Sequence, residues 1–256
     1  MVAVIMVGAR MGLGRPPNYG RLRSWGLWHI AYPGVRALTV RGDAQGLLRL
    51  LDGPGDPPNE DRFSERAMAA FALGTTQATV AIDRLAELLS LDEQLSVRVC
   101  AADALNRIGG PVAAKALIPA LDDENWAVLH AALKTFEATP LPEAWPSIAA
   151  LADGKAHSMV RMTGKARSMT RMNAAGALGQ AKDDKWIPVL ESAIRDKSLL
   201  VTLGAAVGLR DTESPAALVA LTKAGRDVHG VLRKLLLVRA RYRLRRSLRR
   251  GTQPVT

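Results

Sequence analysis

The chain has 256 residues, of which 48% are hydrophobic and only 4% aromatic, which excludes a disordered chain and argues against an aromatic-rich sandwich or barrel. Its single cysteine excludes an internal disulfide and a cysteine-only metal cluster, and its four histidines are scattered. The formal net charge is +11, but nine basic residues lie between positions 229 and 250 and the last acidic residue is Asp227, so the rest of the chain is nearly neutral.

Residues 1–33 show no repeat, and we expect an irregular segment that caps the first helical pair. Their apolar start ends at Arg10, is far shorter than the roughly 18 residues of a membrane span, and lacks the preceding basic residues that a signal peptide requires. We therefore expect a cytoplasmic protein with no transmembrane segment. Translation from Met6 or Met11 is the alternative interpretation of this segment.

A nine-residue pattern recurs through residues 34–226, which we expect to form one repeat domain. Its form, R-x-x-A-A-x-A-L-G, is complete at residues 66–74 and 171–179, nearly complete at 98–105 and weaker elsewhere. The first alanines of successive pairs are separated by 32, 30, 43 and 31 residues and are Ala69, Ala101, Ala131, Ala174 and Ala205. A nearly constant period of this length is typical of helical repeat proteins.

The one long step contains a tandem duplication. Residues 154–163 (GKAHSMVRMT) and 164–173 (GKARSMTRMN) agree at seven of ten positions, and removing one copy shortens the step to 33 residues. We expect a neutral insertion that lengthens a loop or the start of the next helix. The alternative is a flexible basic surface that binds a partner, because methionine adapts to many shapes. The candidate partner-binding residues are Arg161, Arg167 and Arg171.

Each unit also contains an apolar stretch with helical spacing before its alanine pair, for example residues 82–89 and 186–194. Prolines stand near the start of these stretches, and acidic turns such as 122–125 precede the alanine segments, where Asp and Asn cap helices. The glycine that closes the pattern is expected to end the second helix in the left-handed conformation. Because one pair of about 30 residues cannot bury its apolar faces alone, neighbouring pairs must stack. The predicted fold class is all-α, an α-solenoid (right-handed superhelix) of about five to six helical pairs.

The pattern R-x-x-A-A-x-A-L-G, with proline in the first helix and Asp-rich turns, resembles HEAT repeats in the short bacterial form found in phycobilin lyase subunits. The resemblance covers about residues 34–226 and implies a fold rather than a function, because most such repeats are scaffolds. It implies that the second helices line a concave face that binds a partner. It also implies a ladder of ion pairs between repeats, in which the arginine that opens each second helix pairs with an acidic turn. The residues of this ladder are Arg66, Arg98 and Arg171, with Asp92, Asp122 and Asp196.

Three other side chains are predicted to be structural, and a fourth, His130, is predicted to lie at the surface or at the boundary of the core. Trp145 and Trp186 occupy the same apolar place in successive units and are expected in the core, with stacking on a base or a bilin as the alternative. Cys100 and His130 share a variable place before the alanine pair, without the signals of an activated nucleophile or a metal ligand. The chain lacks the common phosphate-binding, dinucleotide-binding, zinc-protease and serine-hydrolase motifs. We therefore expect no catalytic residue, no metal and no cofactor.

Residues 227–256 are predicted to form a basic C-terminal helix and tail. Apolar side chains recur every four residues at Leu236, Ala240, Leu244 and Leu248. We expect the helix to dock on the repeats through Val238, beyond which packing does not explain so many arginines. Guanidinium groups suit the phosphates of RNA, DNA or anionic lipids, and a solvated end without a specific partner is the alternative. The candidate polyanion-binding residues are Arg239, Arg241, Arg243, Arg245, Arg246, Arg249 and Arg250.

Taken together, these patterns favour a non-enzymatic scaffold or adaptor that binds an unidentified protein partner on its concave face. One alternative is a polyanion-binding module that acts through the Arg-rich C-terminal helix. The other is a subunit that resembles a bilin lyase.

Overall fold

The computed structural model describes residues 32–53 and 64–251 of the chain. The chain divides into two compact units, Met1–Ile108 and Gly109–Thr256, which we call unit 1 and unit 2 and describe separately. The segment expected at residues 1–33 lies almost entirely outside the described residues, as does the tail after Gly251.

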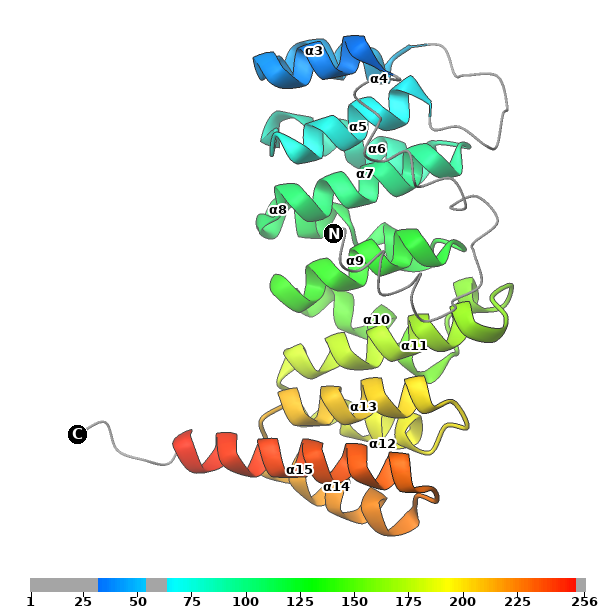
Figure 1. The fold of residues 1–256 in the computed structure, drawn as a ribbon, viewed down its shortest axis with the longest axis vertical. Helices are drawn as coiled ribbons and strands as arrows, with labels where there is room; N and C mark the ends of the chain where they lie inside the picture. The colour runs from blue at the N-terminus through cyan, green and yellow to red at the C-terminus, as the bar shows by residue number, and fades with distance from the viewer. Residues whose placement is uncertain (1–31, 54–63, 252–256) are drawn as a thin grey trace, which may run out of the picture. The chain divides into compact units, whose positions relative to one another are not determined.

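Unit 1 contains two layers of helices. The helix α5 lies between α3 and α7, while α4 packs on α5 and α6 packs on α7 (Figure 1). The elements of unit 1, in chain order, are α3 (Pro33–Arg41), α4 (Ala44–Leu51), α5 (Glu65–Thr75), the 3-10 turn η2 (Thr79–Ala81), α6 (Ile82–Leu91) and α7 (Leu95–Ile108).

Unit 2 repeats the same arrangement. Its second helices, α9, α11, α13 and α15, pack side by side in one layer, which we call the B layer, and η3, α10, α12 and α14 lie in the other (Figure 1). The elements of unit 2 are α8 (Gly110–Ala116), η3 (Pro119–Asp122), α9 (Trp126–Ala138), η4 (Pro142–Ala144), α10 (Trp145–Asp153), η5 (His157–Met159), α11 (Gly164–Leu178), η6 (Gly179–Ala181), η7 (Asp184–Trp186), α12 (Ile187–Ile194), α13 (Leu199–Asp211), α14 (Pro215–Asp227) and α15 (Val231–Gly251).

Six helical pairs can be traced in the described residues, from α4–α5 to α14–α15, with η3 and α8 together forming the first member of the third pair. The prediction of an all-α solenoid is therefore confirmed. The helices begin where the sequence places capping residues: the side chains of Asp43, Ser64, Asn125 and Ser214 each accept a hydrogen bond from the backbone of the helix that follows.

The alanine pairs lie between helices, as the repeat pattern predicts. Ala101 and Ala102 in unit 1, and Ala174 and Ala175 in unit 2, have no exposed surface. Small side chains at these positions let a second helix approach its neighbours closely, so the core of each unit is rich in alanine and leucine.

The expectation that the closing glycine ends the second helix is wrong for Gly74 and Gly179. Gly74 lies inside α5, and Gly179 has a right-handed φ of −63°. The left-handed residues that follow are instead Gln77 and Lys182, with φ of 52° and 48°. A Cβ atom on Gly74 would lie 2.4 Å from the Cα atom of Ala104 in α7. These glycines are thus required by backbone contact between adjacent second helices, and not by the turn.

Candidate functional site

The arginines that open two of the second helices form the predicted ladder. In unit 1, the Arg66 guanidinium pairs with Asp92 and donates from Nε to the carbonyl oxygen of Leu51, 3.2 Å away. In unit 2, Arg171 Nη1 lies 2.5 Å from Asp196 Oδ2, and its Nε donates to the carbonyl oxygen of Ala152 at 3.1 Å. Each arginine therefore joins the end of one helix to the acidic turn of the next repeat.

Arg98, the third arginine of the predicted ladder, donates to backbone oxygens of the acidic turn in its own repeat. Its Nη1 lies 3.1 Å from the carbonyl oxygen of Asp92. The same turn thus receives the side chain of Arg66 on its carboxylate and that of Arg98 on its backbone.

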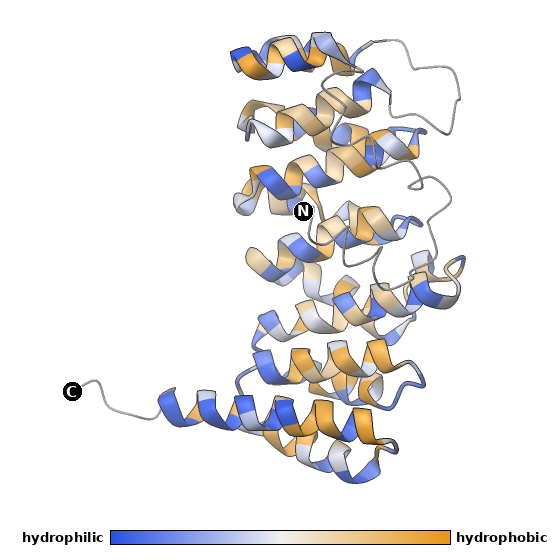
Figure 2. Ribbon diagram, viewed as in Figure 1, coloured by the Kyte–Doolittle hydropathy of each residue, from blue (hydrophilic) through white to orange (hydrophobic). Residues whose placement is uncertain are grey.

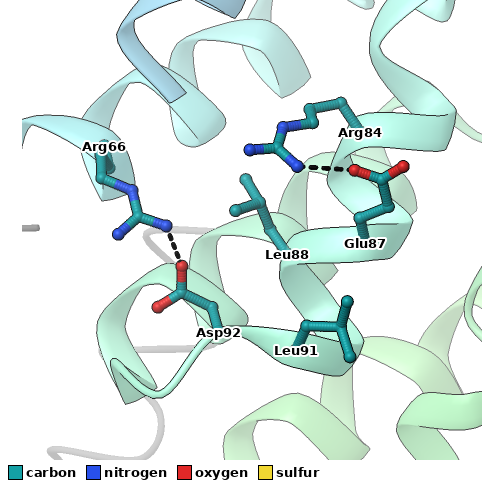
Figure 3. A pocket seen from close by; sticks show the side chains of 6 residues that line it. All are labelled: Arg66, Arg84, Glu87, Leu88, Leu91 and Asp92. Atoms are coloured by element: carbon teal, nitrogen blue, oxygen red, sulfur yellow. Dashed lines mark hydrogen bonds and ion pairs between the residues drawn. The ribbon is translucent and has the colours of Figure 1, made fainter. Parts of the chain in front are cut away.

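A shallow hollow of about 170 Å³ in unit 1 adjoins the Arg66–Asp92 pair (Figure 3). Its other charged groups are also paired: Arg84 lies 2.6 Å from Glu87 and 2.7 Å from Asp52. The hydrogen bond with Glu87 raises the pKa of Arg84, which keeps the guanidinium charged. Because these charges compensate one another, the hollow is better suited to holding α6 in place than to binding an ion.

The duplicated segment is part of the packed structure of unit 2. In the first copy, Gly154 ends α10 with φ of 75°, and the chain then turns through η5 so that Met159 and Met162 are buried. The second copy forms the start of α11. The insertion does lengthen the connection, as expected, but the added residues pack against the unit and contact η3.

The three candidate partner-binding arginines lie in different surroundings. Arg161 is exposed and lies 2.9 Å from Glu124. Arg167 donates to the carbonyl oxygens of Gly154 and Met159, so it holds the loop formed by the first copy. Arg171 belongs to the ladder. Arg167 and Arg171 thus both reach Gly154 at the end of α10, whereas Arg161 pairs with Glu124. The role of the three arginines in binding a partner stays a prediction.

The C-terminal helix α15 packs on both α13 and α14. Docking continues past Val238, where it was expected to end: Ala240 and Leu244 are buried, and Ser247 Oγ donates to Glu213 Oε1 at 3.1 Å. The reason is that the stripe of apolar residues four apart continues into the basic part of the helix and fits against α13 and α14.

Most of the candidate polyanion-binding arginines point away from that docked face. Arg241 is half-buried, and the exposed ones are Arg239, Arg243, Arg245, Arg246, Arg249 and Arg250. The helix is not uniformly charged, because its first half is largely apolar (Figure 2). Several apolar side chains there are exposed. These are Val231, Leu232, Leu235, Val238 and Tyr242. Binding of a polyanion by the arginines stays a prediction.

Among the residues expected to be structural, Trp145 and Cys100 are buried, and burial raises the pKa of the Cys100 thiol far above its usual value. Trp186 is only half-buried, with Lys185 Nζ 5.1 Å from the centre of its ring, so it lies at the edge of the core.

Sequence reasoning missed a polar contact in the B layer. Asn173 Nδ2 of α11 lies 2.9 Å from Nδ1 of His130 in α9. Burial, together with the nearby Lys134, lowers the pKa of His130, so its neutral ring accepts this hydrogen bond. The signal that points to it is the register: both residues directly precede an alanine pair, so they lie at the same level of adjacent helices.

Exposed leucines on the B layer were also missed. Leu199 and Leu203 on α13 are 40% and 36% exposed, although both belong to an apolar stretch whose composition predicts a buried helix. Their spacing of four residues places them on one stripe of the helix, on the side away from the buried Ala205 and Leu209.

Within residues 32–53 and 64–251 there is no group of three or more His, Cys, Asp or Glu side chains placed to hold a metal ion. No helix in the same part of the chain combines the length and apolar character needed to cross a membrane.

Comparison with known families matches residues 59–135 and 162–238, more than half of the chain, to the family model of HEAT repeats. The chain belongs to the HEAT-repeat family. The second match of this HEAT-repeat protein runs into α15, in agreement with the packing of that helix on α13 and α14.

No curated protein matches this HEAT-repeat protein. Among solved structures, it is similar to a chain of the complex of CpcE and CpcF of phycocyanin lyase from Nostoc sp. PCC7120, with 18% sequence identity and a TM-score of 0.44. The similarity covers 91% of this chain and 92% of that chain.

Proposed function

We propose that this HEAT-repeat protein is a non-enzymatic scaffold that binds a protein partner on the outer surface of its B layer. The observation that carries the proposal is the apolar stripe that α13 exposes in the middle of this layer, at Leu199 and Leu203. Apolar side chains that leave more than a third of their surface exposed in adjacent positions are a common feature of a protein interface.

The rigidity of the layer supports this role. A Cβ atom on Gly204 or Gly208 of α13 would lie 2.1 Å or 2.2 Å from a backbone oxygen of α11, so the two helices touch through their main chains. Two helices in such contact keep a fixed spacing, so less backbone freedom is lost when a partner binds across them.

Polar groups beside the stripe support specificity. The contact of His130 with Asn173 fixes two polar side chains between α9 and α11. Where α11 and α13 end, Gln180 Nε2 of η6 lies 3.5 Å from Asp211 Oδ2 of α13. An apolar centre with fixed polar groups around it is the usual composition of a protein-binding surface.

Affinity capture from a native extract, followed by mass spectrometry, tests the proposal with two matched variants. Leu203→Asp places a charge on the proposed surface. Val112→Asp places it on the exposed side of α8, where Val112 is 65% exposed. We expect a protein that the unmodified chain and Val112→Asp retain and that Leu203→Asp loses by about tenfold or more. A partner that both variants retain would place the interface elsewhere and contradict the proposal.

A further inference from the structure

In the stack of unit 2, the pair α12–α13 is covered by α14 of the next pair, whereas the last pair, α14–α15, is followed by no further helix of the described chain. Helix α14 lies against α12 and α13 of the preceding pair and against α15 of its own pair. The side of α14 that is buried among these helices is a stripe of small apolar residues: Ala217, Ala220, Leu221 and Ala224. Each pair of this stack is therefore built to receive a helix from the next repeat.

The α14–α15 pair has a groove of its own, with no further helix of the described chain on it. A hollow of about 340 Å³ lies here between the two helices, and we call its lining the end groove. The end groove consists of Leu218, Val219, Thr222, Lys223, Arg226 and Arg245.

The surface of the end groove is apolar as well as cationic. Val219 of α14 is 68% exposed. Outside this lining but on the same side of α15 as Arg245 lie Val238 and Tyr242, which are 51% and 66% exposed and precede Arg245 by seven and three residues. A terminal repeat that faced only water would carry a polar outer face.

The charge of the end groove is uncompensated. Lys223, Arg226 and Arg245 form no ion pair with a carboxylate among the described residues. The only acidic residue after Glu213 is Asp227, which lies 3.3 Å from Arg195. Any apolar partner that fills the groove must therefore bring negative charge with it.

We propose that the end groove binds an amphipathic α-helix of a protein partner, with a stripe of small apolar residues flanked by Asp or Glu. The architecture favours a helix because the preceding pair, α12–α13, is itself covered by a helix, α14. The apolar side chains disfavour a nucleic acid, whose affinity comes mainly from its phosphates. A second copy of this chain docked face to face would bring the same positive charges together. This interface shares no residue with the stripe of Leu199 and Leu203 that α13 exposes on the B layer.

A synthetic peptide tests the proposal directly. It carries alanine and leucine at the spacing of the α14 stripe and glutamate at the flanking positions, and its affinity for the full-length protein is measured by fluorescence anisotropy. We expect it to bind at least about tenfold more tightly than a scrambled peptide of the same composition and than a peptide with glutamine in place of glutamate.

Two pairs of variants locate the binding site. Val219→Gln and Arg245→Gln alter exposed residues of the end groove, while Val112→Gln and Lys115→Gln make the same types of change on the exposed side of α8. We expect the first two to weaken peptide binding by about fivefold or more and the second two to leave it unchanged. Thermal melts of all four variants confirm that each is folded.

Three results overturn the proposal. The first is equal affinity for the amphipathic and scrambled peptides. The second is peptide binding that all four variants retain. The third is tighter binding to single-stranded RNA or to phosphatidylserine vesicles than to the peptide, with the same loss in Arg245→Gln, which would assign the groove to a polyanion.

Discussion

Residues 154–163 and 164–173 carry nearly the same sequence but have different structures. The first copy is a packed loop with one 3-10 turn, and the second is the start of α11. Their burial is also inverted. Met159 is buried whereas the matching Met169 is half-buried, and Val160 is 69% exposed whereas the matching Thr170 is buried.

The difference shows that neighbouring segments decide the structure of this ten-residue sequence. Both copies begin with a glycine of positive φ, Gly154 at 75° and Gly164 at 54°, so the glycine itself does not separate them. The second copy runs directly into the alanine segment of the repeat, and that segment continues the helix. Arg167, which replaces His157 of the first copy, then holds the loop by donating to two of its carbonyl oxygens.

Deletion of residues 154–163 tests whether the first copy is needed for stability. The deletion removes the buried Met159 and Met162 and uncovers Thr170, which lies 3.6 Å from the sulfur of Met162. We expect the free energy of unfolding to fall by about 3–5 kcal/mol, measured by urea denaturation with circular dichroism. Loop length alone predicts a change within about 1 kcal/mol, and a result in that range would show that the packing of the first copy is dispensable.

Truncation of equivalent methionines compares the two copies directly. Met159→Ala removes a side chain with no exposed surface and should cost about 2–4 kcal/mol, because a cavity remains. Met169→Ala removes a half-exposed side chain and should cost less than about 1 kcal/mol. The same denaturation experiment measures both, and equal costs would contradict the inverted burial.

Truncation of equivalent arginines should separate a structural ion pair from a surface one. Side chains of Arg171 and Asp196 are 17% and 16% exposed, whereas those of Arg161 and Glu124 are 78% and 52% exposed. We expect Arg171→Ala to cost about 2–3 kcal/mol, because it leaves a carboxylate and a carbonyl oxygen without their donor. Arg161→Ala should cost less than about 0.5 kcal/mol. Reversal of this order would mean that the ladder does not stabilise unit 2.

The repeat and the ladder could be predicted because both depend on residues at fixed places in a period. A helical pair needs apolar residues three and four apart, and the arginines that begin the pattern in α5 and α11 each pair with the acidic turn of the next repeat. The role of Gly74 and Gly179 could not be found in this way, because a glycine in a pattern fits a turn and a close contact equally well. Only the position of the next helix decides between them.

The exposed residues of the candidate surfaces were harder to predict for a related reason. Leu199 and Leu203 belong to a stretch so apolar that no periodicity separates a buried face from an exposed one. In α15, the stripe that docks and the stripe that stays exposed both contain apolar residues in its first half, so the sequence alone could not assign them.

The main-chain contact between α11 and α13 limits where this chain can change in length. Successive residues of a helix are rotated by about 100°, so ten residues inserted inside α11 would rotate all that follow by about 80° from their original direction. Gly204 and Gly208 would then face side chains instead of the backbone of α11. The duplication adds its residues before the part of α11 that meets these glycines, so their alignment is unchanged. The connection within a repeat is thus the place where evolution can lengthen this protein without disturbing the contact of one repeat with the next.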